Sequence, residues 1–452
     1  MKLKNTYSGL LCTLLCANIA YANPINGQIT AGQAQITSEA NTTTIQQSSS
    51  KAIVNWDSFN ISQGETTRFQ QPDDGITLNR INSNSGTSLI NGVLTANSQI
   101  ILINGAGIHF GPTAQVNVGG LIASATANIS DKNFLNGDYH FNQALDTKGS
   151  IINEGSIKTA DYGLVALVGN SVTNNGTIEA NLGSVSLGSG EQFVISFNPN
   201  RTSNDLFYFL VTESGNQSGA EIKNTGKIIA DGGAIVVHMN TAEKVLDNVI
   251  NLDGIVQANN VAEKNGEIFI IEGNSLDPNK ITKGSDRKTI NVTGKINASS
   301  SDKKVAGNVL IMSLNNSVNI TGEINLNGLD GGIAAINGNQ AFIDGNAKID
   351  VSGNRDGGGI FLVANDKAYV GSNATLTANS NFLGDGGLLY FTSKHTSILG
   401  SLSARGGSNG GNGGFISISG ASIETAKKYD LGAPKGYAGS VSSQGKPQPI
   451  SP

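Results

Sequence analysis

Cysteine, charged residues and aromatic residues are all scarce in this chain of 452 residues. The two cysteines, Cys12 and Cys16, lie near the N-terminus, so a chain cleaved after residue 22 holds no disulfide and no thiolate metal site. Charged residues make up 14% of the chain, against about 25% in a typical soluble domain. Aromatic residues make up only 6%. This profile argues against a compact helical enzyme core.

Basic clusters and long apolar runs are missing as well. The net charge is −5 without a basic stripe, and we therefore expect no nucleic-acid partner. Beyond the first 22 residues, no run is apolar over the length that a membrane helix needs. Glycine is abundant, with 58 residues, and a polar, glycine-rich composition is also typical of disordered chains. Here, however, β-branched residues recur in regular clusters, which favours many short strands joined by Gly, Asn and Ser turns.

The N-terminus has the organisation of a secretory signal over residues 1–22. Two lysines precede the apolar run 10–19, and Ala20-Tyr21-Ala22 forms an A-x-A cleavage site. We therefore predict a mature chain that begins at Asn23. A lipoprotein signal at Cys16 is the alternative, although the leucine before this cysteine is larger than the small residue that such signals prefer.

Beyond residue 150 the sequence repeats itself. An Asn- or Thr-Gly turn leads into a short alternating strand, and after a gap a glycine leads into an apolar strand. Turns of the first kind begin at residues 153, 174, 224, 292 and 320. Glycine-led strands begin at Gly163, Gly183, Gly233, Gly266, Gly307, Gly332, Gly359, Gly387 and Gly414. The last five begin 25, 27, 28 and 27 residues apart, which is the spacing of stacked repeats.

This period predicts an all-β fold, a parallel β-helix solenoid. At about 3.3 Å per residue, one period forms a coil of three short strands, which buries its apolar residues only when another coil stacks on it. A β-sandwich is the alternative, but sandwiches rarely repeat one strand so regularly. We expect one continuous inward stack, and the irregular segment 193–219 to project from the solenoid as an extra-helical hairpin. The inward stack should contain Ile235, Ile268, Val309, Ile360 and Leu388.

Several segments before residue 150 carry a further pattern. They are Ile53–Ile61 with Asn-Trp-Asp-Ser-Phe-Asn, then Ser98–Ser124, where two apolar strands flank a glycine-rich turn, then Ile129–Asp131 and Phe134–Phe141. In this order they resemble the two-partner-secretion domain, also called the haemagglutination-activity domain, of large exported bacterial proteins. The resemblance is strongest over residues 23–200, and within the family it is closest to the N-terminal region of high-molecular-weight adhesins.

One family motif, Asn-Pro-Asn-Gly-Ile, is altered here to Asn104-Gly-Ala-Gly107-Ile108. Glycine can adopt the turn conformation that proline and asparagine favour, so we expect the turn to persist without the preorganisation that proline gives. By the resemblance, these motifs serve transporter recognition or nucleation of folding, two roles that the sequence does not separate. The residues concerned are Asn55, Trp56, Phe59, Asn104, Gly107, Ile108, Phe110 and Gly111.

The resemblance implies a right-handed β-helix and a secreted or surface-exposed exoprotein with an adhesin-type role. Its implied partners are an outer-membrane transporter, a barrel with periplasmic recognition domains, and a host-cell or surface receptor. We expect no cofactor and no enzymatic activity. The expected domains are a signal peptide (1–22), the secretion domain (23–215), further coils (216–420) and a flexible tail (421–452).

Candidate chemistry is sparse. The histidines His109, His140, His238 and His395 form no zinc motif, and we expect no metal site. Four aspartates precede Gly-Gly at the same point of the repeat, and three of them fall in successive coils: Asp231, then Asp330, Asp356 and Asp385. Stacked carboxylates could bind a cation or serve a polysaccharide lyase or glycosidase, which is the alternative function. We favour plain Asp-Gly turns, because the acidic turns lack companion basic and aromatic residues in the sequence.

Overall fold

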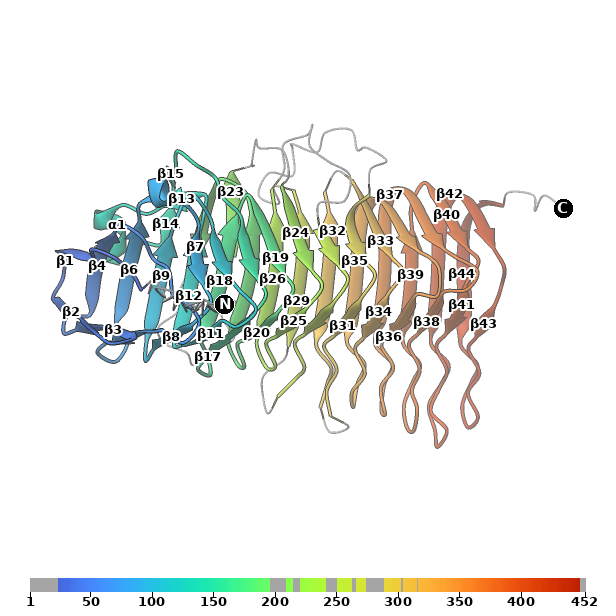
Figure 1. Cartoon of the computed structure of the whole chain (residues 1–452). Helices are drawn as coiled ribbons and strands as arrows, with labels where there is room; N and C mark the ends of the chain where they lie inside the picture. The colour runs from blue at the N-terminus through green and yellow to red at the C-terminus, as the bar shows by residue number, and fades with distance from the viewer. Residues whose placement is uncertain are drawn as a thin grey trace, which may run out of the picture.

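The chain winds into an elongated stack of coils that runs from the blue N-terminal end to the red C-terminal end (Figure 1). The computed structural model describes residues 23–195, 209–213, 220–240, 250–261, 266–273, 288–301, 304–314 and 316–447. The predicted signal peptide lies outside these residues. No helix within the described ranges has the length and apolar character needed to cross a bilayer.

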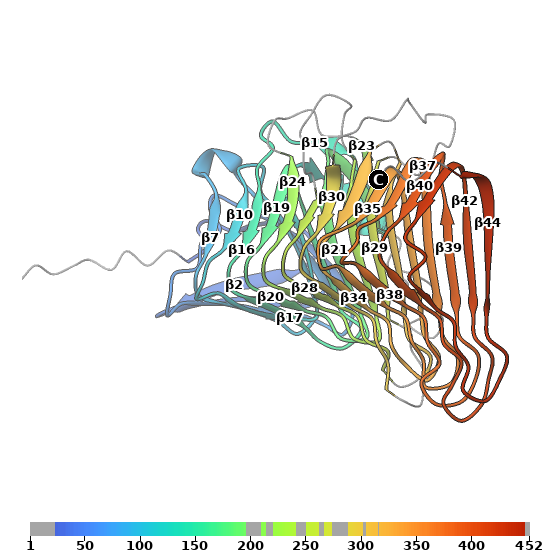
Figure 2. The same ribbon diagram turned by 90° about the vertical axis from the view of Figure 1, so that its right-hand side faces the viewer.

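From β7 onward the coils contribute strands to three parallel stacks, and the coils before it contribute strands to only two of them (Figure 2). Stack one contains β7 (Ser88–Ile90), β10 (Ile108–Phe110), β16 (Ile151–Asn153), β19 (Ser171–Asn174), β24 (Glu221–Asn224), β27 (Ile250–Leu252), β30 (Lys288–Val292), β33 (Ser317–Ile320) and β40 (His395–Ile398).

Stack two forms a separate sheet of 15 strands within the described chain, counting the cap strand β2. It contains β3 (Thr42–Gln47), β5 (Thr66–Gln70), β8 (Val93–Ala96), β11 (Gln115–Val118), β17 (Ser156–Thr159), β20 (Thr177–Glu179), β25 (Lys227–Ile229), β28 (Ile255–Gln257), β31 (Lys295–Asn297), β34 (Glu323–Asn325), β36 (Lys348–Asp350), β38 (Thr375–Thr377), β41 (Ser401–Ser403) and β43 (Tyr429–Asp430).

Stack three contains the glycine-led strands and two early strands, β4 and β9, that follow a serine. Its members are β4 (Lys51–Trp56), β6 (Ile76–Ile81), β9 (Gln99–Ile103), β12 (Gly120–Ser124), β18 (Leu164–Gly169), β21 (Ser184–Ser189), β26 (Ala234–Met239), β29 (Glu267–Glu272), β32 (Asn308–Ser313), β35 (Ile333–Ile343), β37 (Gly359–Val370), β39 (Leu388–Thr392), β42 (Phe415–Thr425) and β44 (Ser440–Pro447). The long strands β35, β37 and β42 also run through stack one, which joins stacks one and three into one sheet.

Glycine begins these strands because the coils approach closely there. A Cβ atom on Gly233 would lie 1.9 Å from the carbonyl oxygen of Gly183 in the preceding coil. The glycine-led period of the sequence is therefore a consequence of backbone contact between neighbouring coils.

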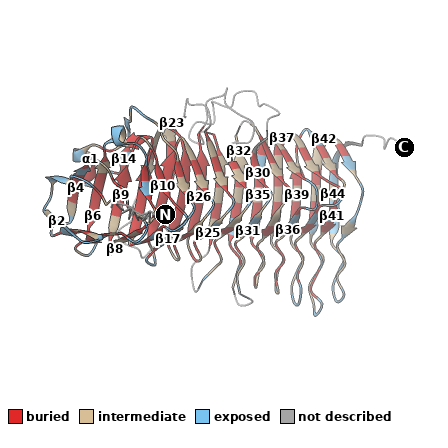
Figure 3. Ribbon diagram, viewed as in Figure 1, coloured by how far each residue is buried: buried red, intermediate tan, exposed pale blue. Residues whose placement is uncertain are grey.

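The solenoid core is one continuous apolar column. Figure 3 shows that buried residues recur in the strands along the whole solenoid. In stack three its members pair in register and are all at most 1% exposed: Ile100, Leu121, Val165, Val185, Ile235, Ile268, Val309, Ala334, Ile360, Leu389 and Ile416. The prediction for Leu388 was wrong, because Leu389 is the residue that pairs with Ile360 and points inward. A shift of one residue along a strand moves a side chain to the opposite face.

A second apolar cluster lies on the outer face of stack three in the N-terminal coils. It is covered by the helix α1 (Asp131–Asn136), by the pair β13 (Ala127–Asn128) and β15 (Gln143–Ala144), and by a small sheet of β14 (His140–Phe141), β22 (Gln192–Ile195) and β23 (Phe209–Glu213). These segments are the extra-helical hairpins that the sequence predicts. Phe141 and Phe193 stack with ring centroids 4.3 Å apart, so the described part of segment 193–219 packs on the solenoid and does not simply project from it.

The C-terminal tail was predicted to be flexible from residue 421, and this prediction was wrong as far as residue 447. The strands β42, β43 and β44 add a further coil, in which Val441 pairs with Ile416. The amide of Ser440 donates to the carbonyl of Gly414 at 3.1 Å. The side chains of this segment bury little apolar surface, and backbone hydrogen bonds to the preceding coil hold it in place instead.

Candidate functional site

The first signature segment, with Asn55, Trp56 and Phe59, lies at the N-terminal end of the solenoid. There the parallel stacking is closed by antiparallel pairs, β1 (Gln28–Ala31) with β4 and β2 (Ala34–Glu39) with β3. Such pairing covers a strand edge that would otherwise be open to other chains. Trp56 is 3% exposed, and its Nε1 donates to Oδ1 of Asn79 at 2.9 Å. Phe59 meets the Trp56 ring edge-on at 5.6 Å, so both aromatic residues hold the cap together.

Asn55, by contrast, is exposed on β4. It lines a small polar pocket of about 280 Å³ together with Asn26, Gln28, Asp57 and Arg80. Nδ2 of Asn26 donates to the carboxylate of Asp57 at 2.7 Å, which fixes the first residues of the cap against β4. Of the three residues of this signature, only Asn55 therefore offers its side chain to a partner.

Arg80 and Lys51 attach α1 to the cap, a feature that the sequence analysis missed. Arg80 pairs with the Asp131 carboxylate at 2.6 Å and donates to the carbonyl of Ile129 at 2.6 Å. Nζ of Lys51 donates to the last carbonyls of the helix, those of Phe134 and Leu135, each at 2.9 Å. Partial burial lowers the pKa of Lys51. Two signals in the sequence mark the ends of this helix. Ser130 is the N-cap and its hydroxyl accepts from the Asn133 amide, and Gly137 is the C-cap.

The altered family motif forms a tight turn around Asn104. The amide of Gly107 donates to the carbonyl of Asn104 at 3.0 Å, and the amide of Ala106 donates to Oδ1 of Asn104 at 2.9 Å. Nδ2 of Asn104 donates to the carbonyl of Gly86 and to Oγ of Ser88 in the preceding coil, both at 3.0 Å. Asn104 is 0% exposed, so this side chain connects two coils from inside the protein.

Gly107, Ile108, Phe110 and Gly111 follow in or beside β10. Gly107 has φ of 107°, in the region that favours glycine. Ile108 and Phe110 are 0% exposed in the core. A Cβ atom on Gly111 would lie 1.9 Å from Oδ1 of Asn91, so a larger residue there would have to displace the Asn91 side chain. Together with Asn104, these residues form the interior of the fold, and their side chains face away from any partner.

The histidines are placed apart from one another. His109 contacts Glu154 at 2.9 Å, His140 contacts Asp138, and His395 contacts Oγ of Ser422 at 2.7 Å. His238 is 1% exposed. Its Nδ1 accepts from the amide of Val211 at 3.0 Å and its Nε2 contacts the carbonyl of Gly273 at 3.1 Å. Burial lowers the pKa of His238.

The aspartates of the late turns form a ladder along the solenoid. Oδ1 of Asp330 accepts from the amide of Asp356 at 3.4 Å, and Oδ1 of Asp356 accepts from the amide of Asp385 at 3.0 Å. Arg355 forms a bidentate pair with Asp330, with bonds of 2.7 and 2.5 Å, and lowers the pKa of that carboxyl group. Each of these carboxylates thus accepts a hydrogen bond from a backbone amide of the next coil.

Asp231 stands outside this ladder. Its carboxylate accepts from the amide of Asn259 at 2.9 Å and from the side chain of Gln257. Within the described ranges, no three side chains of His, Cys, Asp or Glu come together as a group that could hold a metal ion. The acidic turns do have a basic companion, Arg355, which the sequence analysis did not expect.

Comparison with known proteins connects this N-terminal region with a family. Residues 20–297 match the family model of the TPS secretion domain, where TPS stands for two-partner secretion. The chain belongs to this family. The match runs beyond residue 215, where we expected the secretion domain to end. Exoproteins of the TPS family pass through the periplasm to the cell surface or the extracellular space, with a partner transporter in the outer membrane.

Two curated TPS relatives are both described as heme/hemopexin-binding proteins of Haemophilus influenzae. They are 30% identical over 271 residues and 27% identical over 294 residues. The alignments cover 58% and 59% of this chain but only 29% and 30% of the relatives, so the chain spans less than a third of their length.

The crystal structure of the HMW1 secretion domain from Haemophilus influenzae has a similar fold. It matches with a TM-score of 0.63 and 24% identity over 92% of this chain and 100% of that one. This likeness and the parallel stacks confirm the predicted β-helix.

Proposed function

We propose that the N-terminal coils direct this chain through a partner outer-membrane transporter with periplasmic recognition domains, and that the exported solenoid acts in surface attachment and not in catalysis. The observation that carries this proposal is the family match over residues 20–297. For the chain as a whole we propose a signal peptide at 1–22, a secretion domain from residue 23, and further coils that continue it without a break.

The two roles of the signature residues can be assigned from exposure. Asn55 is exposed beside the polar pocket of the cap, and we assign it to contact with the transporter. Trp56, Phe59 and Asn104 are buried, and we assign them to nucleation of the first coils. Coils that fold as they emerge can each serve as a template for the next, which makes export directional.

The test is secretion into the medium by cells with and without the co-expressed transporter gene. Asn55→Ala should reduce secretion while the purified protein keeps its melting temperature. Gly107→Val should reduce both secretion and stability, since valine disfavours the positive φ. Leu89→Ala is the matched control, because the Leu89 side chain is 47% exposed on β7 and does not line the polar pocket beside Asn55. Full secretion without any transporter would contradict the proposal.

A further inference from the structure

An apolar column runs along the outer face of stack three, and the burial of its side chains differs between the two ends of the solenoid. In the N-terminal coils its members Ile101, Ile122 and Ala166 are buried beneath the extra-helical segments. In the later coils this register stays apolar or aromatic from residue 269 to residue 390, where the side chains are only partly buried, and it then reaches the polar Ser417. These positions are Phe269, Leu310, Ala335, Phe361 and Tyr390.

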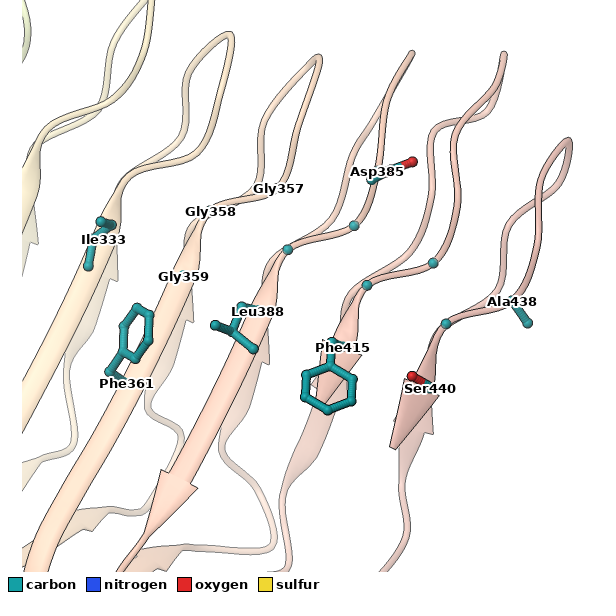
Figure 4. A pocket seen from close by; sticks show the side chains of 15 residues that line it. Ile333, Gly357, Gly358, Gly359, Phe361, Asp385, Leu388, Phe415, Ala438 and Ser440 are labelled. Atoms are coloured by element: carbon teal, nitrogen blue, oxygen red, sulfur yellow. The ribbon is translucent and has the colours of Figure 1, made fainter. Parts of the chain in front are cut away.

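An open groove of about 740 Å³ begins beside this column, where the strands leave the glycine turns. Figure 4 shows the side chains of Ile333, Phe361, Leu388 and Phe415 arranged along it, one from each successive coil. Ile333 is 46% exposed and Phe415 is 40% exposed. The floor is formed by glycine turns: Gly357–Gly359, Gly386–Gly387 and Gly413–Gly414.

The first strand amides that line the groove are already bonded to the preceding coil and are not open to a peptide strand. The amide of Gly359 donates to Gly332, that of Leu388 to Gly358 and that of Phe415 to Gly387, each at 3.0 Å. A peptide that binds by strand addition needs an open sheet edge, and this is a sheet face. A ligand of this groove must therefore bind through contacts with the lining side chains and not by adding a strand to the sheet.

The charge of the lining restricts the ligand further. Asp385 is the only charged residue among those that line the groove. Its Oδ1 accepts from the amide of Asn412 at 2.6 Å, and its other oxygen is without a partner in the described part of the chain. A lone carboxylate without a cation disfavours phosphates, nucleic acids and acidic polysaccharides. Together with the hydroxyl of Ser440, it can accept hydrogen bonds from a neutral ligand rich in hydroxyl groups.

The length of the groove indicates a polymer. The lining spans five successive coils, from Ile333 to Ser440. With a strand spacing of about 4.8 Å, four steps make roughly 19 Å, which exceeds a single sugar ring. Rings and aliphatic chains on one side with hydroxyl acceptors on the other suit pyranose rings, which have apolar C–H faces and polar edges.

We propose that this groove binds a neutral linear polysaccharide, with sugar rings packed on Phe361, Leu388 and Phe415 and hydroxyl groups bonded to Asp385. This proposal deepens the attachment role proposed above and rests on it, because it names the ligand class of that attachment. It assigns the ligand to the coils beyond residue 297, where the family match ends.

The experiment uses the full-length secreted protein and affinity electrophoresis in gels that contain dextran, mannan or xylan, with polygalacturonate as the acidic comparison. At least one neutral polymer should retard the protein, and polygalacturonate should not. The double variant Phe361→Ala/Phe415→Ala should weaken binding at least tenfold, and Asp385→Asn should weaken it less. Phe342→Ala is the matched control, since Phe342 is an outward aromatic residue of β35 outside the groove that packs against Tyr369.

Three results would overturn the inference: no retardation of the wild type by any of the three neutral polymers, equal binding by the double variant, or an equal loss in Phe342→Ala. A reversible dimer that the double variant disperses, seen by sedimentation, would instead assign the groove to a second copy of the chain. Secretion of each variant is measured in the same cells. Failure of export then appears as protein missing from the medium, and failure of this inference as secreted protein that does not bind. Leu388→Ser replaces the double variant if the latter fails to fold.

Discussion

Single buried polar residues decide the register of the coils. Asn153, Asn174 and Asn224 stack at the turn between stacks one and two and are all 0% exposed. Nδ2 of Asn153 donates to Oδ1 of Asn174, and Nδ2 of Asn174 donates to Oδ1 of Asn224, both at 2.7 Å. If one coil shifted by one residue relative to the next, these side-chain amides would lose their partners in the core, where an unsatisfied polar group costs free energy.

The middle asparagine of this ladder should therefore be sensitive. Asn174→Ala leaves Nδ2 of Asn153 with only its 3.5 Å bond to the carbonyl of Thr177, and it removes the side-chain donor to Oδ1 of Asn224. The substitution should lower the free energy of unfolding by about 1–3 kcal/mol. Asn175→Ala, one residue further along and exposed, should change it by about 0.5 kcal/mol or less. Urea denaturation of both variants measures the difference, and equal effects would refute the role of the ladder.

His238 should make the attachment of the extra-helical sheet depend on pH. The neutral ring accepts from the Val211 amide of β23, and a protonated ring could not. Since burial holds the folded pKa below the ordinary value of 6.5, stability is complete above pH 6.5 and falls as the pH drops from there through the folded pKa.

The comparison is of melting temperature between pH 7.5 and pH 5 for the wild type and His238→Asn. The wild type should lose more on acidification than the variant, because only the wild type has this ring to protonate. Identical pH profiles would show that His238 does not contribute.

At the scale of elements, the late turns are built by carboxylates that cap the backbone of the next coil. Asp356 accepts from the Asp385 amide, and the series continues with Asn412, whose Oδ1 accepts from the Tyr437 amide at 3.0 Å. Because an asparagine takes the same position in the last step, the turn needs an acceptor oxygen and no negative charge.

Asp356→Asn should consequently leave the melting temperature nearly unchanged, whereas Asp356→Ala should lower it, since alanine offers no acceptor for the Asp385 amide. Calcium titration followed by thermal melting should give no large stabilisation of the wild type. A calcium-dependent rise in melting temperature that Asp356→Asn abolishes would establish a cation site instead, and cleavage of acidic polysaccharide lost in the same variant would establish an enzyme.

At the scale of the whole molecule, stability is distributed along the column of inward residues that crosses every coil. Each coil contacts mainly its neighbours, so the loss of one core side chain should weaken the interfaces on both sides. Outward residues of the same strands lack this double contact.

Ile268→Ala should therefore lower the free energy of unfolding by about 2–5 kcal/mol, the usual range for a fully buried isoleucine. Ile333→Ala changes the same residue type in the same stack, but this side chain is 46% exposed, and the cost should be about 0.5 kcal/mol or less. Chemical denaturation of the two variants checks the contrast, and a small effect at Ile268 would contradict a continuous core.

The sequence alone determined the repeat, and with it the β-helix and the glycine-led strands, because each coil must present the same glycines and apolar positions to its neighbours. It also determined the family through the order of its signature segments. Only the tertiary structure decided that Leu389 and not Leu388 faces inward, that residues up to 447 stack as a coil, and which signature side chains are exposed. The physical reason is that the direction of a side chain depends on the hydrogen-bond register between coils. Which side chains are covered depends on contacts between segments far apart in the chain, such as Lys51 with α1, and a local sequence pattern does not encode these contacts.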